Sequence, residues 1–506
     1  MVDDGDIGKL GMLGPAESKR MIPLPLNQPS AIAGCWMSLA LMLLSILSSG
    51  CANGGKYCLV DRQCVSSNLA CRFGTSLGPA RCPREVVYPN GISLETELTE
   101  EAAVLLSLWN NAAFLELLTD LGIARGDLVQ AGLLPNPELI YFLPVTDKPF
   151  KYALEFPLEA IWLRPIRVAA AQREYERVCL RLTQSGLDLI RDTRQAYADA
   201  VLARGRQQVA FDAIEIRRQI ANTAKARLDA GDISPQEVST ALIDAARAQQ
   251  DVVRTALEVQ LADERLRNLM GLSDDRETLK LQLIQPQYPT PLGADTLVGL
   301  ATNDRPDAQA ARQAAAAAAE RLRLSKVVWF RFLGLLDATS GRRSGHEFGP
   351  AFRVTLPIFN WNQGNIARAE AELEKAERQR QTIHNQIVLD VQQASMRFAQ
   401  TRAELKVLDE QVRPEAETAI RRTEKAYRQG ETPYVVVLQT TQQLIDSRTR
   451  EVQLHADLRR AWADLERSVG RHLEGLQPPT HEASPPLNDQ PPELQDAPAG
   501  TAKPPK

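Results

Sequence analysis

The chain has 506 residues, which is too long for one compact core and corresponds to about two to four domains. Its 59 Lys and Arg residues against 63 Asp and Glu residues give a net charge of -4, so nucleic acid is not expected as a partner. Charged residues make up 24% of the chain and the mean hydropathy is -0.25, which excludes a bundle of apolar membrane helices. The long middle part is rich in Ala, Arg, Glu, Gln and Leu, a composition typical of extended helices.

The N-terminal part contains an apolar run at residues 31–47, which is short for a membrane span. Lys19 and Arg20 precede this run and small residues follow it, so we assign residues 1–50 to a secretory signal segment. The end of the run resembles a bacterial lipoprotein box, which implies that Cys51 is lipidated and begins the mature chain. An uncleaved signal anchor and a cleaved, unlipidated signal are the alternatives.

A Cys-rich segment at residues 51–93 follows the signal. Four of its cysteines are disulfide candidates: Cys58, Cys64, Cys71 and Cys82. In an exported chain they predict two disulfides among themselves, with three possible connectivities. A zinc site is the weaker alternative, because the cluster has no His and no CxxC pair. Cys179 lies alone in a helical pattern and is expected to be a small buried hydrophobe.

The rest of the chain is organised as an internal repeat followed by a tail. Aligning Pro157 with Pro357 and Gly231 with Gly430 superimposes two copies of one unit about 200 residues apart. We place the first repeat at residues 94–272 and the second, with a preceding linker helix, at residues 273–476. Residues 477–506 are rich in Pro with almost no apolar content, which predicts a disordered tail.

Each repeat contains a predicted β-hairpin. In the first repeat, residues 138–145 and 151–158 read as strands around a turn at residues 146–149. In the second, residues 326–338 and 348–359 flank a turn at residues 339–345, with Pro357 near a strand end. Within the last strand, alternate positions are apolar. Phe352, Val354, Leu356 and Ile358 share one face, and Arg353 and Thr355 share the other. This alternation suits either a barrel wall or a strand pair on a soluble core.

Each hairpin leads into a predicted pair of long helices. From Ile366 to Val412, core positions recur every three or four residues, with one extra four-residue step between Ile387 and Val391. We expect this helix to continue to Tyr427 with a kink at Pro414, to break at Gly430, and to return as an antiparallel helix. The first repeat predicts the same hairpin over residues 166–269, with its break at Gly231. The fold class is therefore mainly α with a small β part.

Five segments resemble the TolC-like outer-membrane efflux family. They occur in the family's order at residues 106–118, 126–139, 301–312, 356–373 and 427–452. The resemblance implies a homotrimer in the outer membrane, with a shared 12-stranded β-barrel and an α-helical periplasmic tunnel. It also implies a lipoprotein that serves as the passive exit channel of a tripartite efflux or type I secretion system. Its partners would be outer-membrane lipid, a periplasmic adaptor and an inner-membrane transporter.

The resemblance places adaptor docking and the closing aperture at the helical turns. The matching positions are Arg227, Leu228, Gly231, Asp232, Ser234, Tyr427, Gly430, Glu431 and Thr432. For the glycines and the hydroxyl residues, ordinary helix capping is the competing explanation, whereas Arg227 and Tyr427 have no capping duty. Some family members carry two aspartates after the second turn. Here those positions are Val436 and Gln439, which indicates a gate closed by packing or amide contacts.

An enzymatic role is not expected, since the five His residues are scattered and no nucleophile, phosphate loop, metal set or cofactor motif stands out. The main alternative is a lipid-anchored periplasmic structural coiled-coil protein without a pore, which leaves the four strands without a purpose. Drugs, metal ions, organic solvents and secreted polypeptides all fit as cargo.

Overall fold

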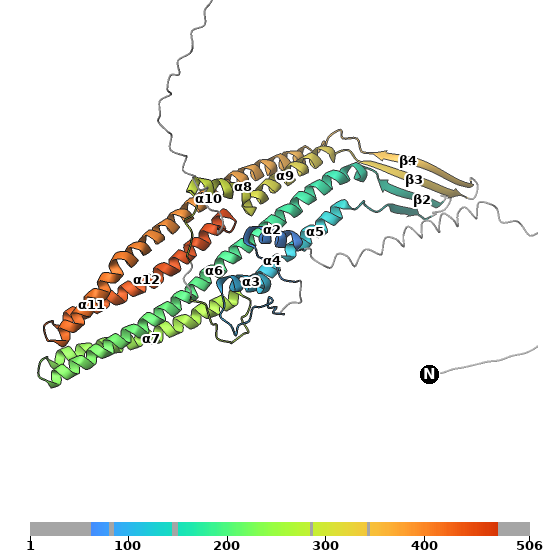
Figure 1. The fold of residues 1–506 in the computed structure, drawn as a ribbon. Coiled ribbons are helices and arrows are strands. Elements are labelled where there is room, and N and C mark those ends of the chain that lie inside the picture. Colours follow the sequence, from blue (N-terminus) through green and yellow to red (C-terminus); the bar gives the residue numbers. More distant parts are fainter. Residues whose placement is uncertain (1–61, 80–84, 144–149, 284–286, 342–344, 474–506) are drawn as a thin grey trace, which may run out of the picture. The chain divides into compact units, whose positions relative to one another are not determined.

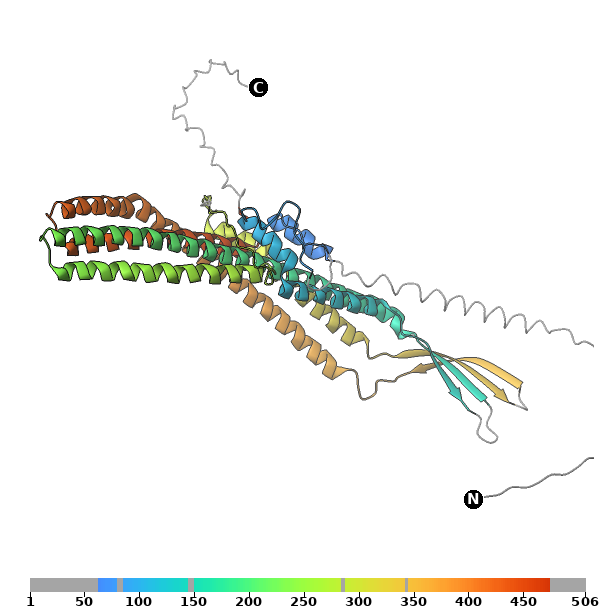
Figure 2. The ribbon, with the colours of Figure 1, turned by 90° about the horizontal axis from the view of Figure 1, so that it is seen from below.

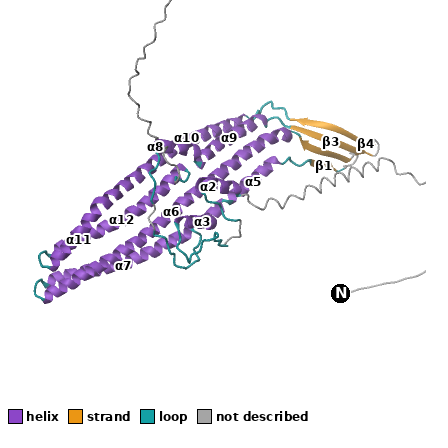
Figure 3. Ribbon diagram, viewed as in Figure 1, coloured by secondary structure: helices purple, strands orange, loops and turns teal. Residues whose placement is uncertain are grey.

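A computed structural model describes residues 62–79, 85–143, 150–283, 287–341 and 345–473 (Figure 1). The predicted signal segment, Cys51, Cys58, Cys82 and the predicted tail lie outside these residues. The described part is mostly helical, with one small sheet, as the sequence predicts (Figure 3). Among the described residues, no single helix is long and apolar enough to cross a membrane. One pair of segments, Glu100–Asn110 and Ala112–Gly132, passes that test together but is bent by 46°.

The two repeats have the same order of elements. The helices α3 (Glu100–Asn110), α4 (Ala112–Leu117) and α5 (Thr119–Gly132) lead into the first hairpin, β1 (Glu138–Phe142) and β2 (Phe150–Pro157). The long helices α6 (Glu159–Asp229) and α7 (Pro235–Leu269) follow. In the second repeat, α8 (Ala294–Asp304) and α9 (Pro306–Val327) lead into β3 (Phe332–Gly341) and β4 (Gly345–Val354). The helices α10 (Gln363–Val407), η2 (Leu408–Val412), α11 (Arg413–Arg428) and α12 (Tyr434–Val469) complete it.

The two hairpins join into one antiparallel sheet of order β1-β2-β3-β4, in which β2 pairs with β3 (Figure 2). The sequence placed the second hairpin less accurately than the first. Lys326 and Val327 belong to the end of α9 rather than to a strand, because the Ala-rich run before them continues the helix. Of the turn predicted at residues 339–345, residues 339–341 belong to β3 and Gly345 begins β4. Strand β4 ends at Val354, so Pro357 lies beyond it.

The long helices confirm the predicted hairpins, with one difference in the second. A π-helical turn, η2, separates α10 from α11, where the sequence predicted only a kink at Pro414. Proline lacks an N–H group and crowds the preceding turn, so the widened turn before it is a local adjustment. It also shifts the helix phase. Ile387, Val391 and Phe398 are buried as predicted, but Val412, predicted in the core, is 46% exposed.

The short helix α2 (Gln63–Phe73) corrects the predicted disulfide pattern. Cys64 is bonded to Cys179 of α6, and Cys71 is a free, exposed thiol. The prediction of disulfides within the cluster is therefore wrong for Cys64, as is the purely hydrophobic role expected for Cys179. Seven residues along one helix separate Cys64 from Cys71 by about 10 Å, which is too far for a disulfide. In contrast, the Cα atoms of Cys64 and Cys179 lie 6.4 Å apart.

Candidate functional site

The four-stranded sheet has one apolar face and one charged face. The register aligns Tyr141, Tyr152, Ala338 and Phe348 in one row, and the same face carries the exposed Phe352. Further residues of this apolar face are Leu139, Leu154, Phe156, Phe332, Leu336, Pro350 and Val354. The prediction that Phe352 and Val354 lie opposite Arg353 is confirmed. Leu356 and Ile358 lie beyond the strand.

The charged face carries every charged strand residue whose side chain the structure describes. These are Glu138, Lys151, Glu155, Asp337, Glu347 and Arg353. Lys151 pairs with Asp337 at 2.9 Å, and Arg353 contacts both oxygens of Glu155, at 2.8 and 3.1 Å. These pairs connect neighbouring and next-neighbouring strands across the face. The other face carries exposed apolar side chains, among them Leu139, Phe348 and Phe352, so the sheet presents a hydrophobic surface on that side.

Aromatic side chains gather where the strands meet the helices. Trp162 at the start of α6 lies 6.3 Å from Phe330 and 6.4 Å from Phe332, measured between ring centroids. Trp329 lies 5.6 Å from Trp361, whose side chain is 51% exposed. Tryptophan combines a large apolar ring with one polar N–H group, so such a cluster suits the boundary between an apolar and an aqueous phase.

At the other end of the helices, the two turns use ordinary capping geometry. Gly231 and Gly430 have left-handed backbones, with φ of 81° and 77°. The N–H of Asp232 donates to the Arg227 carbonyl and that of Glu431 to the Ala426 carbonyl, both at 2.9 Å. The hydroxyl of Ser234 caps α7 by accepting from the N–H of Glu237. Thr432 is half-buried, and the cap of α12 at Pro433 involves no side-chain hydrogen bond.

Arg227 and Tyr427 bring the two tips together. Nη1 of Arg227 donates to the Tyr427 carbonyl at 3.3 Å, and its guanidinium lies 4.8 Å from the centre of the Tyr427 ring. Tyr427 is buried, and this burial raises the pKa of its phenol, although the charge of Arg227 opposes the shift. An apolar cluster surrounds the contact, with half-buried Leu228 packed against it. Its buried members are Ile220, Ala221, Ala224, Val238, Ala241, Tyr427, Tyr434 and Val437.

A second contact between the tips was missed from the sequence. The hydroxyl of Tyr434 in α12 donates to Oδ2 of Asp244 in α7 at 2.9 Å, and both residues are buried. Burial, together with the neighbouring carboxylate, raises the pKa of Tyr434. Asp244 follows Val238 and Ala241 at core spacing on α7, so a carboxylate at a core position was the available signal. Of the predicted gate positions on α12, Val436 is half-buried and Gln439 is exposed.

Polar pairs line the seam between α6 of the first repeat and α12 of the second. As residue numbers rise along α6 they fall along α12, because the helices are antiparallel. We call these pairs the inter-repeat rungs: Asp188–Arg467, Arg194–Glu466, Gln195–Asp464, Asp199–Arg460, Arg206–Gln453, Asp212–Arg448 and Arg217–Gln442. Gly205 permits the close approach, since a Cβ there would lie 2.3 Å from Cγ1 of Val452.

The rungs differ in burial along the seam. The Glu466 side chain is 1% exposed, whereas those of Asp212 and Arg448 are 40% and 35% exposed. Burial alone would raise the pKa of Glu466. Its hydrogen bond with His472 and the charge of Arg194 outweigh burial, so the pKa lies below its ordinary value. Arg194–Glu466 is therefore the most buried of the charged rungs, and the charged rungs on both sides of it are more exposed.

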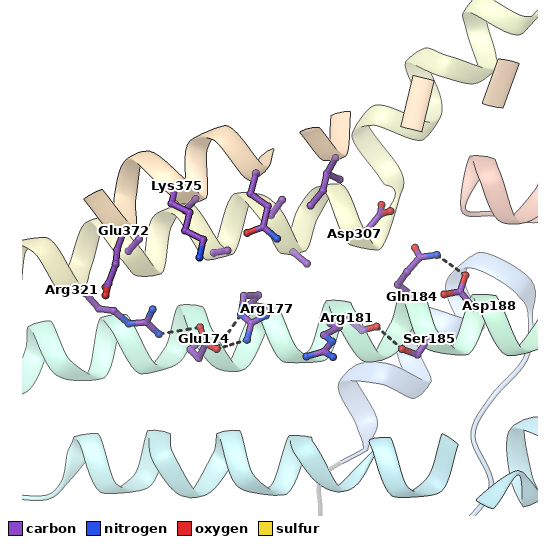
Figure 4. Close-up of a pocket in the computed structure, with 17 residues that line it drawn as sticks. Glu174, Arg177, Arg181, Gln184, Ser185, Asp188, Asp307, Arg321, Glu372 and Lys375 are labelled. Atoms are coloured by element: carbon purple, nitrogen blue, oxygen red, sulfur yellow. Dashed lines mark hydrogen bonds and ion pairs between the residues drawn. The ribbon is translucent and has the colours of Figure 1, made fainter. Parts of the chain in front are cut away.

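A groove of about 550 Å³ continues this polar contact between α6 and the helices α9 and α10 (Figure 4). Glu174 of α6 accepts hydrogen bonds from Arg177 at 2.5 Å and from Arg321 of α9 at 3.2 Å. The hydrogen bond from Arg177 is the main reason that the pKa of Glu174 lies below its usual range. Among the described residues, no group of three or more His, Cys, Asp or Glu side chains could hold a metal ion.

Comparison with known protein families matches residues 149–272 and 297–471 to the outer membrane efflux protein family. This chain belongs to that family. Members of the outer membrane efflux protein family are outer-membrane channels that act as non-enzymatic conduits. Membership of this chain in the family confirms the efflux role and the absence of enzymatic activity that the sequence predicts.

Individual relatives agree with this assignment. The chain is 27% identical over 411 residues to the cobalt-zinc-cadmium resistance protein CzcC of Cupriavidus metallidurans, covering 79% of this chain and 94% of CzcC. The fold is similar to the outer membrane protein VceC of Vibrio cholerae, with a TM-score of 0.63, 17% identity, and coverage of 74% and 97%. It is also similar to CusC, with a TM-score of 0.64, 16% identity, and coverage of 78% and 99%.

Proposed function

We propose that three copies of this chain form the outer-membrane exit duct of a tripartite efflux pump. The observation that carries the proposal is the sheet, whose apolar face is exposed and whose outer strands β1 and β4 pair on one side only. A bilayer has no water to satisfy unpaired strand edges, so a sheet inserted there must close. Three sheets of four strands give a closed 12-stranded barrel, with the apolar face toward lipid and the charged face toward the lumen. The aromatic cluster around Trp162 would lie at the membrane boundary.

The helices also have unpartnered edges that neighbouring copies can cover. Exposed apolar residues line the outer side of α7, at Ile243, Val253, Leu257 and Leu261. A second exposed set lies along α10 and η2, at Leu389, Met396, Val407 and Val412. The helices pack in the order α7, α6, α12 and then α10–α11, so α7 and α10–α11 are the outer pair. Contact between α7 of one copy and α10–α11 of the next would bury both sets and continue the tunnel wall.

The tips are the proposed aperture and the adaptor-docking region. Arg227 with Tyr427, and Tyr434 with Asp244, hold the two hairpins of one copy together. Around them the turns present Gly231, Asp232, Ser234, Gly430, Glu431 and Thr432 for docking. We propose that the narrowest point lies at Val436 and Gln439, six and nine residues after Gly430 of the second tip.

Divalent metal ions are the cargo class that the available observations favour. CzcC, which is matched over most of its length, is named for resistance to cobalt, zinc and cadmium. The charged face of the sheet carries four carboxylates, Glu138, Glu155, Asp337 and Glu347, against two cations, Lys151 and Arg353. An acidic lumen concentrates cations and repels anions.

We also propose that Cys51 is lipidated and anchors the chain. Palmitate label that survives Cys51→Ser would refute lipidation at Cys51.

The proposal can be tested with the purified full chain in planar bilayers. We expect ion conductance with low open probability, and a several-fold higher open probability for Arg227→Ala combined with Tyr434→Phe. Gln443→Ala, an exposed change on the same helix as Tyr434, serves as the control and should behave like wild type. Absence of conductance from a monodisperse monomer would favour the structural coiled-coil alternative.

The cargo requires a separate test in cells. Deletion of the gene should sensitise cells to zinc or cobalt more than to organic drugs; the reverse order would refute a metal cargo.

A further inference from the structure

The helix α2 is fixed to the first repeat by a covalent bond and by packing. Cys64 forms the disulfide with Cys179 of α6, and Val65 and Leu69 of α2 are fully buried. Both terminal methyl groups of Leu69 lie where a Cβ on Gly186 would approach within 3.1 Å, so α2 sits directly on the α6 backbone. These residues belong to one apolar cluster with α3, α4 and α6.

The opposite end of α2 contacts the second repeat instead. Nη1 of Arg72 donates to the Gly470 carbonyl at 3.3 Å, and the N–H of His472 donates to the Arg72 carbonyl at 3.0 Å. The rings of Phe73 and His472 lie 6.3 Å apart. Gly470 ends α12 in the left-handed conformation, with φ of 83°. Helix α2 therefore connects α6 to the last residues after α12.

These contacts occur beside the buried rung of the inter-repeat seam. The guanidinium of Arg194, which pairs with Glu466, lies 5.9 Å from the centre of the Phe73 ring. His472 in turn approaches Glu466 within 2.6 Å. One short helix thus touches both repeats at the position where their polar seam is driest. From there to the tips, the side chains of the next charged rungs are more exposed.

We propose that α2 is a strap, installed by oxidation of Cys64 and Cys179, that holds the two repeats together at this end of their seam. Forming the strap removes two protons and two electrons from the two thiols, and a disulfide-bearing protein of the oxidising compartment accepts them to become a dithiol. With the strap in place, the exposed rungs near the tips can exchange partners with water while the buried end stays fixed. The inference rests on the contacts of α2 and on export of the chain to an oxidising compartment, and it goes beyond the proposed transport role.

Hydrogen exchange of the full-length protein in detergent tests the strap. The variant Cys64→Ser/Cys179→Ser should exchange the amides of α2, and also those of the last two turns of α12, about tenfold faster than wild type. The amides of the tip cluster around Tyr427 should keep their wild-type rates. Cys71→Ser, which removes the exposed free thiol from the same helix, is the matched control and should change nothing.

A second arm avoids any folding defect of the variant. Folded wild-type protein treated with dithiothreitol should show the same two faster regions, and reoxidation should restore protection. Faster exchange in α2 without any change at the end of α12 would overturn the proposal, because α2 would then be attached to the first repeat without stabilising the second. Unchanged exchange in both regions would overturn it as well.

Discussion

Two seams run along the same helix, α6, and they differ in how much of the contact is made by exposed polar pairs. Against α7, the buried residues include Ala241, Ala248, Ala262 and Leu266, together with one largely buried ion pair, Arg204–Asp263, at 2.8 Å. Against α12, the contacts are the inter-repeat rungs, most of them partly exposed. Separating an apolar seam costs free energy in proportion to the area exposed, whereas water can replace partners in exposed polar pairs at little cost. We therefore expect the seam between the repeats to separate more readily than the seam between α6 and α7.

The largest effect is expected at the buried end of the polar seam. Glu466→Ala removes the partner of Arg194, whose side chain is only 12% exposed, and leaves an incompletely paired charge. Breaking a buried pair on one side costs about 3–5 kcal/mol. The urea midpoint of the purified protein should fall accordingly. An unchanged midpoint would mean that the Arg194–Glu466 rung is as solvent-exposed as the rungs near the tips.

A similar or slightly smaller loss is expected in the seam between α6 and α7. Leu266 of α7 is fully buried in a cluster with residues of α3 and α6, and Leu266→Ala should cost about 2–5 kcal/mol through lost burial and a cavity. Because no charge is involved, the loss should be the same at low and high salt. A strong salt dependence would contradict the apolar character of the cluster around Leu266.

At the tips, Tyr434→Phe should cost about 1–3 kcal/mol, because it leaves buried Asp244 without its hydroxyl donor. The raised pKa of Tyr434 also gives a pH dependence. A phenol whose pKa is higher in the folded state stabilises the fold below its unfolded pKa of about 10, and this stabilisation is lost as the pH rises further. Wild type should therefore lose more stability than Tyr434→Phe between pH 9 and 11. Parallel pH profiles would show that the phenol is exposed.

The smallest effect belongs to the exposed rungs. Asp212→Asn removes the charge opposite Arg448, and both side chains are more than a third exposed. We expect a loss below about 1 kcal/mol that disappears in high salt. Measuring the free energy of unfolding of Asp212→Asn and Glu466→Ala in the same salt series would allow the two rungs to be compared directly. A cost for Asp212→Asn equal to that of Glu466→Ala would contradict the difference in burial between these two rungs.

Features set by local periodicity were predictable from the sequence. The core spacing and the breaks at Gly231 and Gly430 gave the long helices and their turns, because these depend on neighbours three to five residues away. The internal repeat allowed the elements of the second copy to be predicted from those of the first. The bounds of β3 and β4 were less certain, since residues 326–331 suit a helix end as well as a strand.

Features that depend on which helices become neighbours were not predictable. Cys64 pairs with a cysteine 115 residues away, and nothing in its spacing indicates Cys179. The charged residues of the inter-repeat rungs look like a solvated helix face when α6 or α12 is read alone. Asp244 is the exception, because a carboxylate at a core position signals a buried partner even before that partner is known.

The central claim is that the sheet closes only through neighbouring copies, and crosslinking between edge strands tests it most directly. In one chain, β1 and β4 are separated by two strands, about 14 Å apart, so a disulfide between them within a copy is impossible. Ile140→Cys would be combined in turn with Gly349→Cys, Ala351→Cys and Arg353→Cys in a Cys71→Ser background, and oxidised in membranes. We expect a reducible covalent trimer for at least one pair and for none of the four single-cysteine variants; monomer alone in every combination would contradict closure through neighbouring copies.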